Sequence, residues 1–174
     1  MMVISAYTFW YFGNCIIESA AGQTRAPDVL VDAPSLEDIG FRFVRILLCI
    51  VFFIAPPVIY YGYTRQADII LYVLLAYTAF FSPIGLLSVV LHDRIAALNP
   101  ILLIRSVLKT FFSYMKLVIL FYIAGCLFFF VSRISLRFLL NIVINAASIY
   151  LFIILGHILG RYYWQNQEKL DWDI

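Results

Sequence analysis

Charged residues are scarce in this sequence. Only 13% of the 174 residues are charged, whereas 64% are hydrophobic. Soluble domains carry roughly a quarter charged residues and about half apolar ones, so this composition cannot be wrapped in a polar shell. The shortage of charge therefore excludes an ordinary soluble domain. The near balance of twelve basic and ten acidic residues also argues against nucleic acid as the main partner.

Cysteines and catalytic motifs are few as well. Cys15, Cys49 and Cys126 lie inside apolar runs without a CxxC pair, so we expect them to be buried as small apolar side chains. The sequence has no GxSxG, HExxH or P-loop motif and no carboxylate pair at catalytic spacing. We therefore expect that the chain is not an enzyme and has no metal site.

Long apolar runs make up most of the chain instead. A hydrocarbon core about 30 Å thick needs about 20 mostly apolar residues in one helix. The sequence thus predicts an all-α, polytopic transmembrane helical bundle of about five spans, forming a single domain. The expected spans cover approximately residues 2–21, 43–63, 69–91, 112–131 and 138–159. No basic segment or cleavage motif precedes the first run, so we expect that run to be retained.

The segments between the runs are short and partly amphipathic. Residues 35–42, with Ser35 as a helix N-cap, and residues 92–110 are expected to be interfacial helices. Residues 160–174 are expected to form a polar and aromatic tail at the membrane surface. Pro56 and Pro57 predict a kink or an early end in the second span, and the segment 82–85 predicts a kink in the third.

The distribution of Lys and Arg predicts an orientation. Under five spans, nine basic residues fall on one side and three, namely Arg65, Arg133 and Arg137, on the other. The more basic side is expected to be cytoplasmic, which places the N-terminus outside and the C-terminus in the cytoplasm. The nine are Arg25, Arg42, Arg45, Arg94, Arg105, Lys109, Lys116, Arg161 and Lys169.

Polar residues inside the expected spans are the candidate site, because burying them in lipid is costly. Glu18 and Asn14 form a possible intramembrane polar site. Glu18 is a carboxylate that snorkels to the interface or pairs between helices, with Arg25 or Arg42 as candidate partners, or it is a proton or cation site. Other residues of the last span are expected to pack helices together, through amide and hydroxyl hydrogen bonds or through the close approach that a Gly-x-x-x-Gly pair permits. These are Asn141, Asn145, Ser148, Gly156 and Gly160.

The two histidines allow one cofactor hypothesis. Under five spans, His92 and His157 lie near the cytoplasmic ends of their helices, and an imidazole pair on facing helices can ligate haem b. The simpler interpretation makes His92 an interfacial residue and leaves the chain without a cofactor. We adopt the simpler interpretation and keep haem as an alternative.

Three segments of the chain carry a resemblance: SAAGQTRAPD, SPIGLLSVVLHDRIAALNPILLIRSVLKTFFSY and LGRYYWQNQEKLDWD. They resemble a family of bacterial multi-span membrane proteins of unknown function, found in planctomycetes and several proteobacteria. The similarity covers most of residues 18–173, and its markers are Pro83, the ALNP turn at 97–100 and the end from GRYY to LDW. The resemblance implies a bacterial cytoplasmic membrane protein that is shortened at its N-terminus. It implies no activity.

Three functions are compatible with these observations. The first is a non-catalytic integral membrane subunit or scaffold of a larger assembly, with membrane lipids and other membrane subunits as partners. The second is a transporter, channel or lipid-handling protein, because proline-broken helices can build sites at membrane depth. The third is a haem-bearing electron-transfer subunit.

Overall fold

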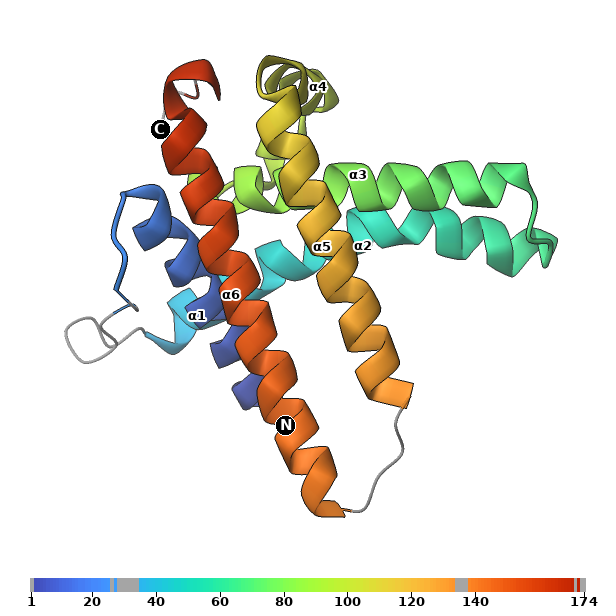
Figure 1. The fold of residues 1–174 in the computed structure, drawn as a ribbon, viewed down its shortest axis with the longest axis horizontal. Helices are drawn as coiled ribbons and strands as arrows, with labels where there is room; N and C mark the ends of the chain where they lie inside the picture. Colours follow the sequence, from blue (N-terminus) through green and yellow to red (C-terminus); the bar gives the residue numbers. More distant parts are fainter. Residues whose placement is uncertain (1, 26, 28–34, 134–137, 171, 173–174) are drawn as a thin grey trace.

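The computed structural model describes residues 2–25, 27, 35–133, 138–170 and 172, and the side chains of residues 5–25, 27, 35–127, 146–170 and 172. Within these ranges every regular element is a helix (Figure 1). A short turn, residues 65–68, separates α2 from α3, and α4 and α5 are almost continuous. In chain order the elements are α1 (Met2–Ala20), α2 (Leu36–Thr64), α3 (Ile69–His92), the 3-10 helix η1 (Ile95–Leu98), α4 (Pro100–Lys109), α5 (Phe111–Arg133) and α6 (Phe138–Leu170).

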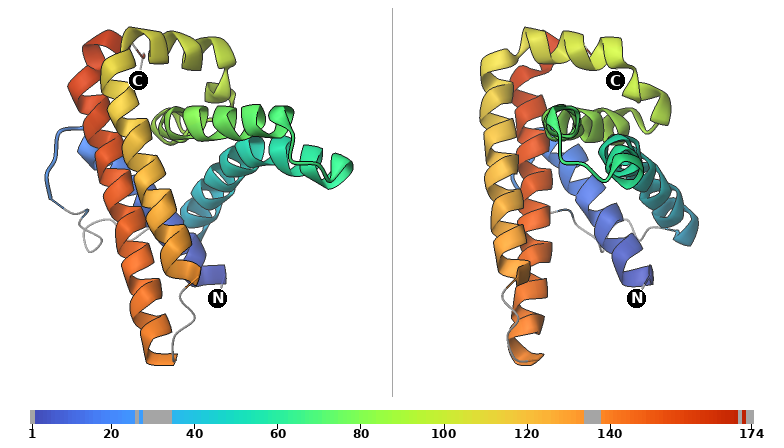
Figure 2. Two further views of the ribbon diagram at one scale, coloured as in Figure 1. Left: turned by 45° about the vertical axis from the view of Figure 1, so that its right-hand side comes forward. Right: turned by 90° about the vertical axis from the view of Figure 1, so that its right-hand side faces the viewer.

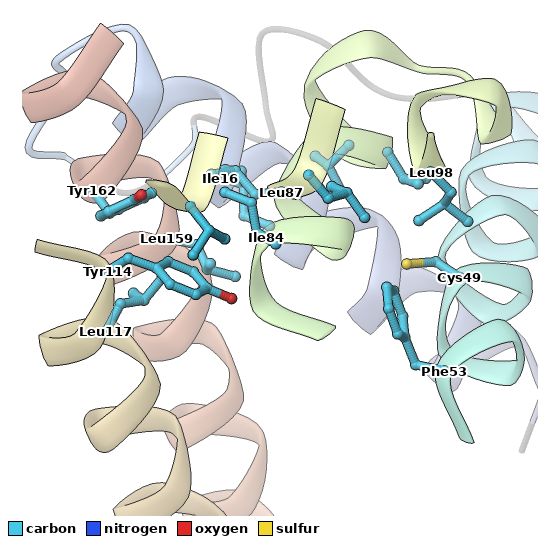
Figure 3. Close-up of a cluster of buried hydrophobic side chains, with 14 of the residues drawn as sticks. Ile16, Cys49, Phe53, Ile84, Leu87, Leu98, Tyr114, Leu117, Leu159 and Tyr162 are labelled. Carbon is cyan, nitrogen blue, oxygen red and sulfur yellow. The ribbon is translucent and has the colours of Figure 1, made fainter. Parts of the chain in front are cut away.

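The core lies where α1, α3, α5 and α6 meet (Figure 3). Ile16 of α1, Ile84 of α3 and Leu159 of α6 are completely buried there. Tyr114 of α5 is also fully buried, and its hydroxyl donates a hydrogen bond to the Phe80 carbonyl of α3. A smaller part of the same cluster, with Phe53 of α2, lies where α2 enters the core.

The α2–α3 hairpin leaves this core sideways, running across the direction of α5 and α6 (Figures 1 and 2). Its turn is held by Asp68, the N-cap of α3, which accepts a hydrogen bond from the Leu71 backbone at 3.1 Å. The Tyr60 hydroxyl of α2 donates to the same carboxylate. The Tyr60 hydrogen bond, followed by the Leu71 hydrogen bond, lowers the pKa of Asp68. The cap therefore persists in acid until the pH falls through this lowered pKa.

The tandem proline does not end α2. Of the kink and the early end that the sequence predicted as alternatives, the early end is therefore wrong. The helix continues through Pro56 and Pro57 to Thr64. Because Pro57 has no N–H, the Phe53 carbonyl one turn earlier loses its helical partner. The Thr78 hydroxyl of α3 donates to that carbonyl at 2.7 Å. A side chain from the neighbouring helix thus satisfies the backbone group that proline leaves free.

The segment between α3 and α5 forms one turn of 3-10 helix followed by α4. Asn99 caps α4 by accepting a hydrogen bond from the Ile101 backbone at 3.0 Å, and Pro100 occupies the first turn. Ser88, which is fully buried in α3, donates to the Ala97 carbonyl and fixes η1. At Thr110 the chain bends by 106° into α5.

The last helix is longer than expected. The predicted span ended near residue 159 and was followed by a tail, but α6 continues without a break to Leu170. Inside this extension Tyr162 hydrogen-bonds to the Thr110 hydroxyl, and Leu170 is only 3% exposed. Trp172 then folds back and donates its indole N–H to the Ser106 hydroxyl of α4 at 2.8 Å. The extension is helical because residues 161–170 contain no glycine or proline and one face of them packs against α4 and α5.

Three helical segments in the described ranges are long and apolar enough to cross a membrane: Leu36–Thr64, Ile69–His92 and Ala146–Leu170. The bent pair of α4 with residues 111–127 makes a fourth if it counts as one broken span. The structure thus shows an all-helical protein with three to four candidate spans, which is compatible with a membrane protein. It does not confirm five.

One of the three cysteines departs from the sequence expectation. Cys15 and Cys49 are buried, as predicted, whereas Cys126 is exposed on α5. Its neighbours Tyr122, Ile123 and Leu127 are large, apolar and exposed as well. An apolar run places a cysteine in a helix, but only the packing of that helix decides which face is covered.

We expect Gly160→Ala to destabilise the protein by about 1–3 kcal/mol, the usual cost of overpacking a tight contact. A Cβ at this position would lie 2.5 Å from the Ser19 Cβ and 2.9 Å from the Ala20 backbone nitrogen of α1. Thermal unfolding of the full chain in detergent measures the change. Gly62→Ala is the matched control, because nothing lies within 4 Å of its added Cβ. Equal melting temperatures for the two variants would contradict the close contact.

Candidate functional site

The polar residues predicted as a site lie along α1 and on the two helices that cover it, α2 and α6. On the α6 side, the Ser19 hydroxyl and His157 Nδ1 are 2.6 Å apart, within hydrogen-bonding distance. Ser19 is only 2% exposed, so no substrate reaches its hydroxyl in this conformation. A serine hydroxyl beside a histidine is also the combination of a nucleophile and a base in hydrolases. Because this pair is buried, we interpret it as a hydrogen bond that joins α1 to α6.

Gly156 and Gly160 stand on either side of His157 and bring α6 against α1. A Cβ on Gly156 would lie 2.9 Å from the Phe12 ring. That ring stacks on Phe152 of α6 with centroids 4.0 Å apart. The helices approach closely where glycine removes the side chain, and the ring stack and the Ser19–His157 hydrogen bond lie along the same contact.

On the α2 side, Asn14 accepts a hydrogen bond from the Arg42 guanidinium. Arg42 is half-buried, and its aliphatic part crosses α1 at Gly13, where an added Cβ would lie 2.8 Å from the Arg42 Cδ. One turn further along α2, Arg45 forms an ion pair with Asp93, whose side chain is more than half exposed. Two arginines of α2 therefore reach two different elements, α1 and the end of α3.

Glu18 is half-buried and has no hydrogen bond or ion pair to any side chain that the structure describes. The sequence offered Arg42 as one partner for it, but Arg42 is directed to Asn14 instead. Arg25, the other suggested partner, is exposed and forms no ion pair with Glu18. Asn14 and Glu18 thus share a helix but not a common partner.

The histidines proposed as haem ligands have different partners. His92 ends α3, where its Nδ1 lies 3.0 Å from the Ser88 carbonyl and its ring centroid 5.3 Å from that of Trp172. His157 faces Ser19 across the α1–α6 contact. Among the described side chains, no three or more His, Cys, Asp or Glu residues cluster so that they could hold a metal ion.

Ser148 contributes to a predominantly apolar cavity of about 500 Å³ between α1, α5 and α6. Its walls include Thr8 and Phe9 of α1, Ala124 of α5 and Phe152 of α6. Neither Asn14 nor Glu18 lines it. Asn141 and Asn145 were also expected to join helices, but their side chains lie outside the described residues.

Ser19, Arg42 and Trp172 are among the contact-forming residues whose partners the sequence did not identify. A signal for Ser19 was present, because Phe12, Ile16 and Ser19 follow one another at helical spacing and share the face toward α6. For Arg42 the sequence suggested Glu18 as the partner, and the structure has Asn14 instead. No sequence signal joins Trp172 to Ser106, which is 66 residues away along the chain.

Comparison of the chain with protein-family models, with curated proteins and with solved structures finds no match. The resemblance to a bacterial membrane protein family stays a prediction.

We expect Asn14→Leu to lower the free energy of unfolding by about 1–3 kcal/mol, because it leaves the half-buried Arg42 guanidinium without its acceptor. Arg42→Leu with Asn14→Leu should cost less than the sum of the two single changes, since neither polar group is then left unpaired. Unfolding of all three variants in one detergent gives the coupling energy.

Arg45→Gln is the control for loss of one positive charge on the same helix. Its ion pair with Asp93 is largely exposed, so its removal should cost no more than about 1 kcal/mol. Additive effects of the Asn14 and Arg42 changes would show that their hydrogen bond carries no stability.

Proposed function

We propose that this protein is a non-catalytic integral membrane subunit, and that its α2–α3 hairpin packs against helices of a partner subunit. The observation that carries the proposal is the hairpin's apolar surface. Where α2 and α3 meet the rest of the fold, Cys49 and Phe53 are buried. Beyond that point large apolar side chains of both helices are exposed, among them Val58 (61%), Ile59 (69%), Ile69 (77%), Tyr72 (61%) and Val73 (62%).

The direction of the hairpin supports a protein partner rather than lipid alone. The hairpin runs across the direction of α5 and α6 (Figure 2). If α5 and α6 cross a bilayer, the hairpin therefore does not cross it in the same direction. Packing against further helices would cover this surface and align it. Gly62, with no atom within 4 Å of an added Cβ, leaves room for such close helix packing.

The proposed placement follows the charge bias. In the five-span arrangement α1, α2, α3, α5 and α6 all cross a bacterial cytoplasmic membrane, with the N-terminus outside and the C-terminus in the cytoplasm. α4 then lies on the cytoplasmic surface beside the bend at Thr110. The arrangement requires the hairpin to turn toward the direction of α5 and α6 when it meets its partner.

Photo-crosslinking from the hairpin tests the subunit role. A photoreactive phenylalanine analogue at Val58 or at Val73 should crosslink to the same single protein in native membranes. That protein should also co-purify with the wild-type chain in mild detergent. Lipid adducts alone at both positions, together with a monodisperse lone monomer after purification, would overturn the proposal.

Ile123 of α5 is the matched control position, because it is apolar, 54% exposed and carried by a helix that is not part of the hairpin. We expect it to give lipid adducts only. The same protein adduct at Ile123 would show that the contact is not specific to the hairpin.

A second candidate, lipid handling, is favoured by the apolar cavity between α1, α5 and α6. A volume of about 500 Å³ is within the range of small-molecule sites and accommodates part of an acyl chain. Because Glu18 does not line the cavity, its carboxylate has no direct role in such binding. This candidate therefore does not need the ion path that Glu18 and Asn14 would provide.

Filling the cavity tests this candidate. We expect Gly125→Trp, which places an indole at the cavity wall, to abolish any transfer of fluorescent lipid between the leaflets of liposomes containing the protein. Gly62→Trp, on an open surface of α2, is the control. Absence of transfer with the wild-type chain would remove lipid movement as a function.

A further inference from the structure

A second cavity, of about 370 Å³, lies between α5 and α6 near the bend at Thr110, and its lining is amphipathic. Lys116 of α5 and Arg161 of α6 face it from opposite helices. The Ser113 hydroxyl and the Gln165 amide add neutral hydrogen-bonding groups. Leu120 and Ile158 supply an apolar wall on the side away from the bend. The two cations therefore lie between neutral polar groups on the side of the bend and apolar groups on the far side.

Neither cation is neutralised within the described part of the chain. Lys116 is exposed, Arg161 is half-buried, and no described carboxylate forms an ion pair with either. The Arg161 guanidinium carbon lies 4.5 Å from the centre of the Trp164 ring, which fixes the position of the charge but does not cancel it. Two positive charges at one cavity, without an acidic partner, favour an anionic ligand.

The depth of the cavity fits a lipid headgroup. α4 exposes Ile101, Ile104 and Leu108 together with Arg105 and Lys109, while Leu103, Ser106 and Val107 face the protein. Such a helix lies in the plane of a membrane interface. Lys116 follows the start of α5 by five residues, or roughly 7 Å along the helix axis. It is therefore close to the level at which phosphates stand.

The order of the two cavities along α5 and α6 is a second indication that the ligand is a lipid. The basic cavity is lined by residues up to Leu120 of α5 and from Ile158 of α6, and the apolar cavity begins at Phe121 and ends at Leu155. On both helices, the residues that line the apolar cavity thus follow directly on those that line the basic cavity. This is the order of a phosphate followed by an acyl chain.

We infer that the cavity between α5 and α6 binds one anionic glycerophospholipid. Lys116 and Arg161 donate hydrogen bonds to its phosphodiester oxygens, Ser113 and Gln165 bind its polar headgroup, and its acyl chains run along Leu120 and Ile158. The inference rests on the proposed membrane placement of α5 and α6, but it does not depend on the subunit role or on lipid transfer.

Native mass spectrometry of the full-length protein in detergent tests the site. The added lipids are phosphatidylglycerol and phosphatidylcholine with the same acyl chains. The wild type should retain phosphatidylglycerol preferentially. Lys116→Gln or Arg161→Gln should weaken that binding about 5-fold each, and both together about 25-fold, because each cation contributes about 1 kcal/mol of attraction to an anionic lipid, which corresponds to about a 5-fold change in binding. Binding of phosphatidylcholine should weaken less, because its own choline cation already cancels the charge of its phosphate.

Two further variants separate the site from general charge. Arg94→Gln with Lys169→Gln removes the same net charge from exposed positions that do not line the cavity, and it should leave phosphatidylglycerol binding unchanged. Lys116→Arg should restore binding, which also shows that the position tolerates substitution. Circular dichroism of every variant confirms that its helices are formed.

Three outcomes would overturn the inference. The first is equal retention of both lipids by the wild type, and the second is equal loss of phosphatidylglycerol in the control variant. The third is displacement of the lipid by millimolar inorganic phosphate, because the site would then recognise a soluble anion. Each is read without reference to crosslinking or lipid transfer, so failure here is distinguishable from failure of either proposed function.

Discussion

The close approach of α1 to α6 is the contact on which the rest of this fold depends. Glycines at 156 and 160 remove the side chains that would hold the two backbones apart, and the Ser19–His157 hydrogen bond joins the helices at that level. Dispersion and hydrogen bonding must supply this attraction, because lipid tails offer apolar surfaces no driving force to associate with one another. With α1 fixed on α6, α2 is positioned through Asn14 and Arg42, and α3 through the core around Ile84.

Hydrogen bonds from side chains to backbone groups hold the irregular points of the structure. Thr78 satisfies the carbonyl that Pro57 leaves free, and Ser88 fixes the 3-10 turn after α3. Every buried side-chain nitrogen or oxygen in the described ranges has a hydrogen-bond partner. An unpaired polar group in a low-dielectric interior would cost several kcal/mol, so this pairing is what allows breaks and bends inside the fold.

The surface divides into parts with different chemistry, and the proposals follow that division. The hairpin presents apolar side chains in a direction that α5 and α6 do not share, which favours a partner with helices of its own. The region between α5 and α6 is basic near the bend and apolar beyond it, which favours an amphipathic ligand. Asn14 and Ser19 of α1 serve helix contacts, whereas the Glu18 carboxylate has no partner among the described residues.

The sequence by itself determined the helical class, the membrane-like composition and most helix positions, because hydrophobic run length and local capping are properties of nearby residues. The cap at Ser35 and the approximate extent of α3 are of this kind. Tertiary structure alone decided the continuation of α2 through its prolines and the extension of α6 to Leu170. In both cases a neighbouring helix supplied the partners: Thr78 for the free carbonyl in α2, and Thr110 with Ser106 for the end of the chain. It also decided that Arg42 bonds to Asn14 rather than to Glu18, because that choice depends on how α2 crosses α1, which no local pattern encodes.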